Sequence, residues 1–268
     1  MPRSVKHHIS GKQDLKSLRY LMSQPTASQL RDYRENCAEK RRFARDRALQ
    51  IHTVMGAGSF IDEAIQMAGV EPLVLAALED TDYFEEFLSV IWDKNMLSME
   101  IILDEKPDLF IRRGWYENMS FWSPGMFRKY MKPCLEKEIR WAHEAGVKYA
   151  YINTCGYMRI LDDIIESGVD VLIGVDPFED KTLDMRVLKK KAQSKMCLWG
   201  GDNKQHGAMW TSRPTKIKGV VGRGAPGAPF IFYTIQPSRF TWPLPASNFS
   251  QWTAWSVYCV LGSGTDSG

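Results

Sequence analysis

Short runs of consecutive apolar residues recur along the chain, separated by longer stretches of helical periodicity. Runs that are apolar at nearly every position are typical of parallel strands buried on both faces, whereas recurrence every three or four positions is typical of amphipathic helices. The six predicted strands lie at about 49–58, 108–115, 147–156, 169–177, 195–203 and 228–237. The predicted helices lie at 26–49, 61–68, 81–105, 123–146, 158–168 and 183–193. This alternation predicts the α/β class, with a parallel sheet covered by helices.

Sequence signals mark the ends of the helix predicted at 123–146. Ser123 is a suitable N-cap, Pro124 suits the first turn and Gly146 suits the end. Pro133 lacks an amide hydrogen, so it is expected to bend this helix or divide it in two.

Two arrangements of a parallel sheet agree with this pattern: an open doubly wound sheet and a closed (β/α)8 barrel of the TIM type. The glycine-rich turn GAGSF at 56–60 lacks the G-x-G-x-x-G spacing of dinucleotide-binding open sheets, and no phosphate-binding lysine follows it. The barrel is therefore favoured. It is expected to be incomplete, because six strands are predicted where a barrel has eight. The stretch 206–229 is glycine-rich and has little periodicity.

Composition narrows the function classes. The 268 residues are 44% hydrophobic and 25% charged, which is ordinary for a globular protein. A net charge of +3 is too small to indicate nucleic-acid binding. The five cysteines have no paired spacing, which argues against a disulfide framework and for the reducing cytoplasm. No apolar run approaches the ~18 residues of a transmembrane helix, so neither a membrane span nor a signal peptide is expected.

Polar residues and glycines follow the predicted strands at the ends that would meet at the mouth of a barrel, where barrel enzymes place their active sites. The candidate site residues at these ends are Met55, Ser59, Trp115, Tyr116, Glu117, Asn118, Asn153, Cys155, Asp176, Gly201, Asp202, Asn203 and Lys204. Each group is weak evidence by itself. Together, five strands with similar residues at the same end predict one binding site.

Cys155 and Asn153 each allow a functional and a structural interpretation. A thiol at the mouth could bind a metal or act as a nucleophile, whereas a small buried residue before Gly156 could simply finish the strand. Asn153 could hydrogen-bond a substrate or cap the next helix. Both interpretations stay open at this point.

Glu117 and Asp176 are the candidate acids. Glu117 follows two aromatic residues, and a carboxylate in apolar surroundings has a raised pKa that suits an acid or base. It could equally be an exposed loop residue. Asp176 could point into the mouth or cap the following turn. The stretch 202–204 follows two glycines, which let backbone approach a ligand closely but also occur in any tight turn.

The order and spacing of three segments resemble the uroporphyrinogen decarboxylase superfamily. GWYENMSFWSPGMFRKYMKPCLEKEIRWAHEAGV (114–147) is similar to a strand followed by a helix that begins with Ser-Pro. YINTCG through VDVLIGVDP (151–177) is similar to the H-x-C-G block, and LDMRVLKKKAQSKMCLWGGDNKQ (183–205) resembles the next strand and its turn. The resemblance covers about 45–205. The WYENM string and the Gly-Gly-x-x-Lys turn resemble the cobamide-dependent methyltransferase branch more than the decarboxylase.

The resemblance implies an α/β barrel that transfers a methyl group between a small methylated substrate and a corrinoid (cobamide), which a partner corrinoid protein usually carries. It assigns proton donation at the leaving heteroatom to Glu117 or Asp176. It places Cys155 and Asn153 in contact with the substrate or with a weakly held metal. The remaining candidate residues would bind the substrate.

Zinc is a second cofactor that the resemblance implies, but the ligand set is incomplete in this sequence. The zinc methyltransferases of the superfamily use His-x-Cys at this strand and a later cysteine near the last strand. Here Asn153 takes the place of the histidine, and QPSRFTWP (236–243) contains no cysteine. Because a catalytic zinc needs about three protein ligands, Cys155 alone predicts weak binding.

The resemblance also sets the domain prediction. Relative to the superfamily the chain starts about two strands late, as if truncated at its N-terminus. We expect a polar helical extension at 1–45, the incomplete barrel at 46–262 and a disordered tail at 263–268.

Two rival functions stay open. One is decarboxylation of uroporphyrinogen, which needs an arginine-rich cavity that the mapped strand ends do not show. The other is a truncated, non-catalytic barrel that binds a small molecule or forms a homodimer to cover open sheet edges.

Overall fold

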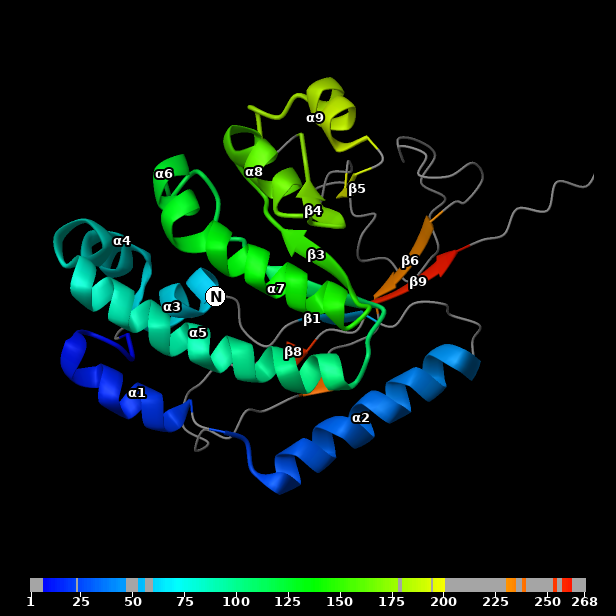
Figure 1. The fold of residues 1–268 in the computed structure, drawn as a ribbon, viewed down its shortest axis with the longest axis horizontal. Helices are drawn as coiled ribbons and strands as arrows, with labels where there is room; N and C mark the ends of the chain where they lie inside the picture. The colour runs from blue at the N-terminus through cyan, green and yellow to red at the C-terminus, as the bar shows by residue number, and fades with distance from the viewer. Residues whose placement is uncertain are drawn as a thin grey trace, which may run out of the picture.

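Five parallel strands form the central sheet of the described structure, and they lie side by side in chain order (Figure 1). They are β1 (Thr53–Met55), β2 (Leu109–Arg113), β3 (Lys148–Ile152), β4 (Val171–Val175) and β5 (Cys197–Gly200). The computed structural model describes residues 7–22, 24–46, 53–55, 60–177, 180–193, 195–200, 230–234, 238–239, 253–254 and 257–261.

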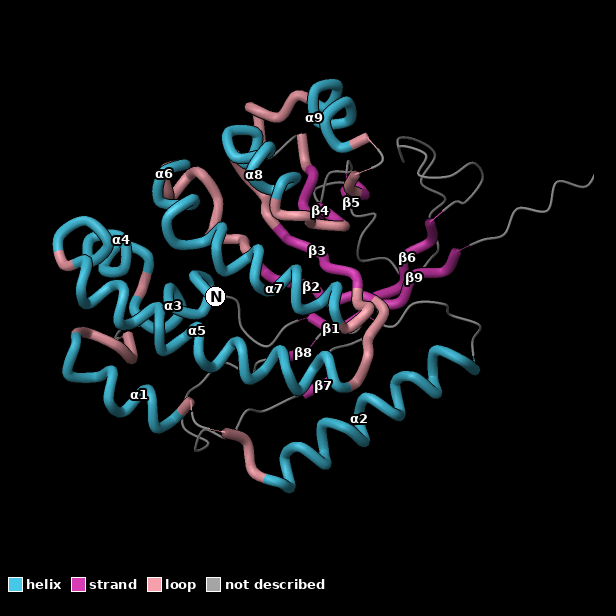
Figure 2. The backbone as a smooth tube through the Cα atoms, viewed as in Figure 1, coloured by secondary structure: helices cyan, strands magenta, loops and turns pink. Residues whose placement is uncertain are grey.

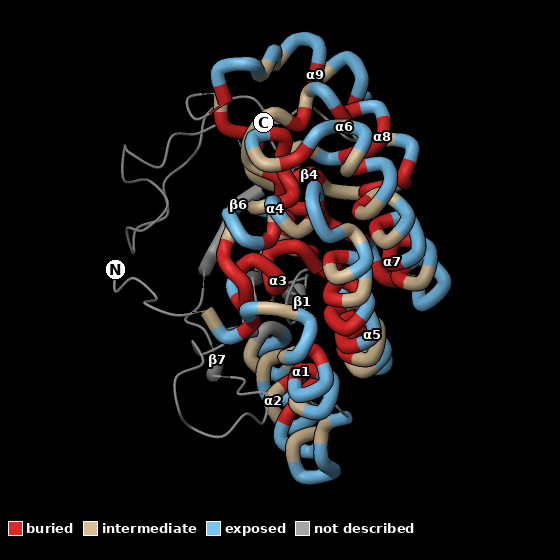
Figure 3. The backbone as a smooth tube through the Cα atoms, turned by 90° about the vertical axis from the view of Figure 1, so that its left-hand side faces the viewer, coloured by how far each residue is buried: buried red, intermediate tan, exposed pale blue. Residues whose placement is uncertain are grey.

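Helices connect these strands and cover one face of the sheet (Figure 2). Figure 3 shows α5, α7 and α8 on the same side of the strands, with the buried sides of α5 and α7 turned toward the sheet. The helices are α1 (Leu15–Leu21), α2 (Ala27–Asp46), α3 (Phe60–Ala68), α4 (Val70–Glu79), α5 (Thr81–Asp104), α6 (Pro124–Met126), α7 (Lys132–Glu144), α8 (Leu161–Glu166) and α9 (Met185–Ala192), with short turns η1 (Lys12–Asp14) and η3 (Tyr157–Ile160) and a π-helical segment η2 (Phe127–Met131). None of the helices in the described ranges is long and apolar enough to cross a membrane.

The predicted α/β class is confirmed, and the first five predicted strands form the parallel sheet. The sixth does not extend it. Residues 230–234 form β6 (Phe230–Thr234), but β6 pairs antiparallel with β9 (Val257–Leu261), and β7 (Ser238–Arg239) pairs with β8 (Thr253–Ala254). The expectation that the sixth strand continues the parallel sheet is therefore wrong, because its apolar pattern fits either orientation. Helices α1 and α4 were not predicted.

Successive residues of each strand point to opposite faces of the sheet, and both faces are apolar, as in buried parallel strands. On the face toward the helices, Phe110 of β2 stacks on Tyr149 of β3 at a ring separation of 5.5 Å. On the other face, Ile111 of β2 lies beside Ala150 of β3. The first face belongs to the main hydrophobic core, and the second forms a separate apolar cluster.

The helix predicted from Ser123 begins as expected, since the Ser123 side chain accepts a hydrogen bond from the Met126 amide at 3.2 Å. Its last part, α7, ends at Glu144, two residues before Gly146, whose φ of 75° favours glycine. Pro133 does not divide it. The π-helical segment η2 ends at Met131, directly before α7. The backbone hydrogen bonding therefore changes from the π-helical to the α-helical pattern just before Pro133, which lacks an amide hydrogen.

The N-terminal helices pack on the same core as the sheet. Leu15 and Leu18 of α1 are buried, as are Tyr33 and Cys37 of α2. The guanidinium of Arg41 in α2 pairs with the carboxylate of Glu105, which follows α5. These contacts join α1 and α2 to the helix layer.

Candidate functional site

The loops that follow β2, β3 and β4 meet at the carboxyl edge of the sheet. The amide of Gly156, after β3, donates to Asp180 Oδ2, after β4, at 2.7 Å. Asn153 Nδ2, at the end of β3, lies 3.4 Å from the carbonyl oxygen of Glu117, after β2. The structure therefore brings the residues that follow three strands into one region, and two of the candidates, Glu117 and Asn153, are in direct contact there.

Glu117 lies beneath this edge and is completely buried. Its Oε1 accepts from Arg112 Nη2 at 2.6 Å, and its Oε2 accepts from the Tyr151 hydroxyl at 2.8 Å. Oε1 also lies 3.4 Å from the amide nitrogen of Ile61 at the start of α3. Glu117 is thus an ion-pair partner inside the protein rather than an exposed loop residue.

A second buried carboxylate joins the same cluster. Glu138 of α7 lies with Oε2 3.1 Å from Arg112 Nη1, and the Tyr149 hydroxyl donates to it. Burial by itself lowers the pKa of Arg112, but the carboxylates of Glu117 and Glu138 outweigh burial and raise this pKa well above its usual range. One guanidinium faces two carboxylates, so the cluster carries one surplus negative charge when both are ionised.

Burial also sets the protonation of the groups around Arg112. It raises the pKa of Tyr149, with a further increase from Glu138, and it raises the pKa of Tyr151, with a further increase from Glu117. Both phenols therefore stay protonated and act as hydrogen-bond donors. Because Tyr149 and Tyr151 belong to the helix-covered face, the cluster lies between the sheet and α7.

We expect Glu138→Gln to change how stability depends on pH. Burial raises the pKa of Glu138 above its ordinary 4.5, and Arg112 only partly opposes this. The folded state then holds the Glu138 proton more tightly than the unfolded chain, so this contribution to stability is complete below about pH 4.5 and is lost as the pH rises through the folded pKa. Glutamine mimics the protonated form at every pH, so the variant should gain stability relative to the natural protein as the pH rises.

Urea denaturation from about pH 4 to about pH 8 measures this difference. Glu136→Gln is the matched control, because Glu136 is an exposed glutamate on the same helix. Stability curves of Glu138→Gln and the natural protein that stay parallel over this range would contradict the prediction.

Trp115, Tyr116 and Asn118 shape the loop after β2. Trp115 is 40% exposed, and the Arg113 guanidinium lies 5.9 Å from the centre of its ring. The Tyr116 amide donates to Asp62 Oδ1 at 2.8 Å. Asn118 Nδ2 donates to the carbonyl oxygen of Trp115, so Asn118 closes the loop. Of these three candidates, Trp115 offers the accessible aromatic surface.

Cys155 and Asp176 lie at the carboxyl ends of β3 and β4. Cys155 is partly exposed, and Asp176 is 7% exposed. Tyr157 is fully buried nearby, and its hydroxyl has no hydrogen-bond partner among the described residues. Burial raises the pKa of Tyr157, and Asp180, Cys155 and Asp176 raise it further. The Tyr157 phenol and the carboxyl groups of Asp176 and Asp180 therefore share the region around Cys155.

Asn153 is completely buried between this region and the Arg112 cluster. Its Nδ2 is 3.3 Å from the Tyr151 hydroxyl, while its Oδ1 has no partner among the described residues. The backbone of Gly174 in β4 approaches closely, since a Cβ there would lie 2.7 Å from the Asn153 carbonyl oxygen, and its φ is 98°. This contact lets the polar end of β3 pack against the bulge in β4.

The other candidate residues receive less support. Met55 ends β1 beside Ile111 of β2, in the expected strand position. Ser59 lies outside the described residues. The same is true of the four candidates in the turn after β5, which are Gly201, Asp202, Asn203 and Lys204.

The described residues do not fit a zinc site. They contain no group of three histidine, cysteine, aspartate or glutamate side chains placed to hold a metal ion. At the third strand, Asn153 supplies an amide where imidazole would be needed, and Cys155 is the single thiolate-forming residue. No chemical step is assigned to zinc.

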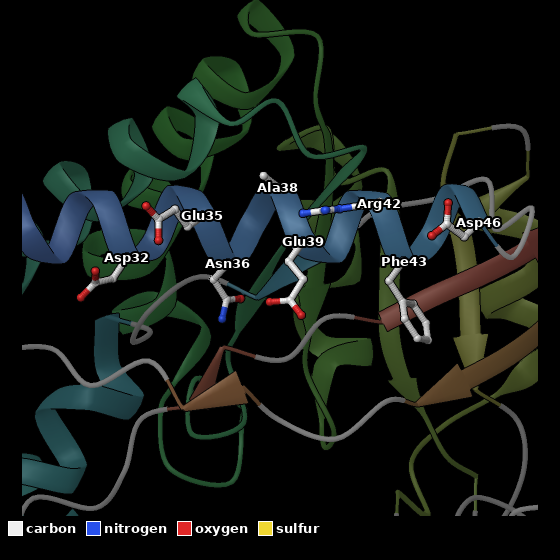
Figure 4. Close-up of a pocket in the computed structure, with 8 residues that line it drawn as sticks. All are labelled: Asp32, Glu35, Asn36, Ala38, Glu39, Arg42, Phe43 and Asp46. Carbon is white, nitrogen blue, oxygen red and sulfur yellow. The ribbon is translucent and has the colours of Figure 1, made fainter.

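Two surface hollows lie away from the carboxyl edge. The larger, of about 840 Å³, is an open groove along α2, and Figure 4 shows Asp32, Asn36, Glu39 and Phe43 pointing to the same side of that helix. The smaller, of about 470 Å³, lies on the outer side of α7 near His143. His143 pairs there with Asp170, which precedes β4 at the amino end of the sheet. Neither hollow includes a candidate site residue.

Sequence reasoning missed Arg112, Glu138, Tyr149 and Tyr151. Arg112 is a charged residue inside an otherwise apolar strand, and the two tyrosines are separated by one residue, which places them on one face. Those signals were available in the sequence. The position of Glu138 opposite Arg112 depends on how α7 packs on the sheet.

Comparisons with known proteins leave the family open. No family model and no curated protein matches the sequence. A solved structure of a methyltransferase from Methanosarcina mazei is similar to this chain with a TM-score of 0.45 and 17% sequence identity. The match covers 53% of this chain and 40% of that protein, so this chain matches less than half the length of its structural neighbour. A similarity of this size identifies neither a family nor an activity for this chain.

Proposed function

We propose that this chain is a relative of the uroporphyrinogen decarboxylase superfamily, built on part of its α/β barrel, and that it transfers a methyl group between a small substrate and a corrinoid on a partner protein. The observation that supports this proposal is the strand order β1-β2-β3-β4-β5. In a doubly wound sheet the strand order reverses at a switch point, whereas in a barrel successive strands are neighbours all the way round.

The distribution of helices supports the same arrangement. A doubly wound sheet has helices on both faces, and a barrel has them on the outer face alone. Here the described helices α5, α7 and α8 lie on one side of the strands (Figure 3). The face with Ile111 and Ile152 corresponds to the interior of a barrel.

The carboxyl edge of β2, β3 and β4 is the proposed reaction site, as in barrel enzymes. Asp176 is the proposed acid: it gives its proton to the leaving heteroatom of the substrate as the bond between that atom and the methyl carbon breaks. Cys155 contacts the substrate, and Trp115 provides an apolar wall. When bound, a corrinoid would supply the cobalt centre that accepts the methyl group.

Glu117 has a different role in this proposal. Its two oxygens are held by Arg112 and Tyr151, and it has no exposed surface. We therefore propose Glu117 as a positioning residue that fixes the loop carrying Trp115, rather than as the acid that meets the substrate.

A visible-absorbance titration tests the proposal. The purified protein is mixed with methylcobalamin and thiol acceptors, or with reduced cobalamin and a panel of methyl donors. We expect conversion between the two cobalamin spectra. Asp176→Asn should lower the rate by about 10²–10⁴-fold, the usual contribution of a positioned acid, and Cys155→Ser should lower it as well.

Matched controls separate these effects from unfolding. Cys197→Ser alters an exposed cysteine that begins β5, at the opposite end of the sheet, and Asp162→Asn alters an exposed aspartate of α8. Both should keep the natural rate. Unchanged spectra with every donor and acceptor, or natural rates in Asp176→Asn and Cys155→Ser, would contradict the proposal.

A further inference from the structure

The face of the sheet opposite the helices forms a continuous apolar surface, which we call the inner face. Its members come from four neighbouring strands: Leu109, Ile111, Ala150, Ile152, Val171, Ile173 and Trp199. The strand register aligns them in rows across the sheet. Ile152 lies beside Ile173, and Ile173 lies beside Trp199.

The inner face is buried on β2 and β3 and half-buried at Val171, Ile173 and Trp199, although the described helices contribute no residue to it. Ile111 is 1% exposed and Ala150 is 0% exposed, and Leu109 and Ile152 are also buried. A soluble protein rarely leaves an apolar patch larger than a few hundred Å² in water. A further segment must therefore lie over these residues.

Strands β6 and β9 are suited to this position. They pair antiparallel with each other over five residues, from Phe230 opposite Leu261 to Thr234 opposite Val257. Their sequences, FIFYT and VYCVL, are rich in β-branched and aromatic residues. β9 also lies against β1, the strand at the edge of the sheet next to β2 (Figure 1).

Each part lacks what the other provides. A two-stranded antiparallel pair is marginally stable by itself and needs an apolar surface to pack on. The apolar residues of the inner face need a segment to pack against them. β9 already contacts β1, which lies beside the inner-face strand β2. From these observations we propose that the β6–β9 pair of the same chain packs on the inner face, where a complete barrel would have its remaining parallel strands.

A second copy of the chain is the alternative occupant. A second copy would cover the inner face by contacts between two molecules. The β6–β9 pair would cover it by contacts within one molecule. The two arrangements can be distinguished by a cross-link, and the outcome does not depend on whether the protein transfers methyl groups.

The test places one cysteine on the inner face and one in β9. The full-length chain carries Ile111→Cys together with serine at the other four natural cysteines, which are Cys37, Cys134, Cys155 and Cys197. One version keeps the natural Cys259. The other carries Tyr258→Cys and Cys259→Ser, because successive strand residues face opposite sides and one of the two positions should face the sheet.

Mild oxidation at low protein concentration should form a disulfide within one chain in one of the two versions, seen as the loss of two hydrogens in the mass of the monomer. Tyr20→Cys, in place of Ile111→Cys, is the control and should not cross-link, because Tyr20 lies 80% exposed on α1. A disulfide only between two chains, or none in either version, would overturn the proposal.

Hydrogen exchange of the unaltered chain gives a second measurement that needs no substitution. The amides of β6 and β9 should exchange at least about a hundredfold more slowly than those of an unstructured peptide of the same sequence. Exchange at the peptide's rate would overturn the proposal.

Discussion

Arg112→Met should lower the free energy of unfolding by about 3–5 kcal/mol, the usual effect of removing one partner from a buried ion pair. Arg112 is 2% exposed and lies within 2.6 Å of Glu117 and 3.1 Å of Glu138. Without the guanidinium, two carboxylates remain buried, with the Tyr149 and Tyr151 hydroxyls and the Ile61 amide as their hydrogen-bond donors. At least one of them must take up a proton for the protein to fold.

Urea denaturation monitored by tryptophan fluorescence measures this loss. Arg128→Met is the control, because Arg128 also pairs with an aspartate, Asp163, but the Arg128 side chain is half exposed and Lys132 still pairs with Asp163 after the substitution, so stability should change much less. Arg112→Met combined with Glu138→Gln should recover part of the loss, since it removes one uncompensated charge. If Arg112→Met is as stable as Arg128→Met, the buried cluster does not exist as described.

Lys94→Met should lower the free energy of unfolding by a similar amount, about 3 kcal/mol or more. Lys94 of α5 lies with Nζ 2.7 and 2.9 Å from the two carboxylate oxygens of Glu63 in α3, and both side chains are almost entirely buried. The substitution removes the cation and leaves the Glu63 carboxylate between two packed helices. Methionine fills nearly the same volume, so lost packing contributes little.

A double variant separates the ion pair from the packing. Glu63→Met with Lys94→Met replaces both charges by apolar side chains, and such replacements of buried pairs are often neutral or stabilising. We expect it to unfold at a urea concentration close to that of the natural protein and well above that of Lys94→Met. A double variant less stable than Lys94→Met would show that the pair itself stabilises the contact between α3 and α5.

The two buried ionic groups connect stability to the candidate site. Glu63 lies in the first turn of α3, beside Asp62, which holds the backbone of Tyr116. Glu117 is the next residue of the same loop, and its carboxylate is held to β2 by Arg112 and to β3 by Tyr151. The loop that carries Trp115 is therefore fixed from two sides. We expect substitutions in either ionic group to affect ligand binding at the carboxyl edge as well as folding.

Much of the fold follows from local sequence patterns. Apolar runs of five residues and helical periodicity identified the strands of the parallel sheet and most of its helices, because burial on both faces of a strand or one side of a helix restricts which residues can occupy each position. Ser123 and Gly146 marked helix ends because their side-chain and backbone properties act within one turn. The strand alternation also assigned the polar residues of β2, β3 and β4 to one edge of the sheet.

Other features depend on contacts between distant segments, which a single sequence does not specify. The pattern of 228–237 indicated a strand, but its antiparallel pairing with β9 is set by a segment more than twenty residues away. Glu117 looked like a loop carboxylate with access to substrate, yet it lies buried because Arg112, Tyr151 and the start of α3 surround it. A charge in an apolar segment is visible in the sequence as an exception. The packing of α7 and α3 on the sheet decides which carboxylates pair with Arg112. It also decides whether Arg112 and these carboxylates are exposed to solvent.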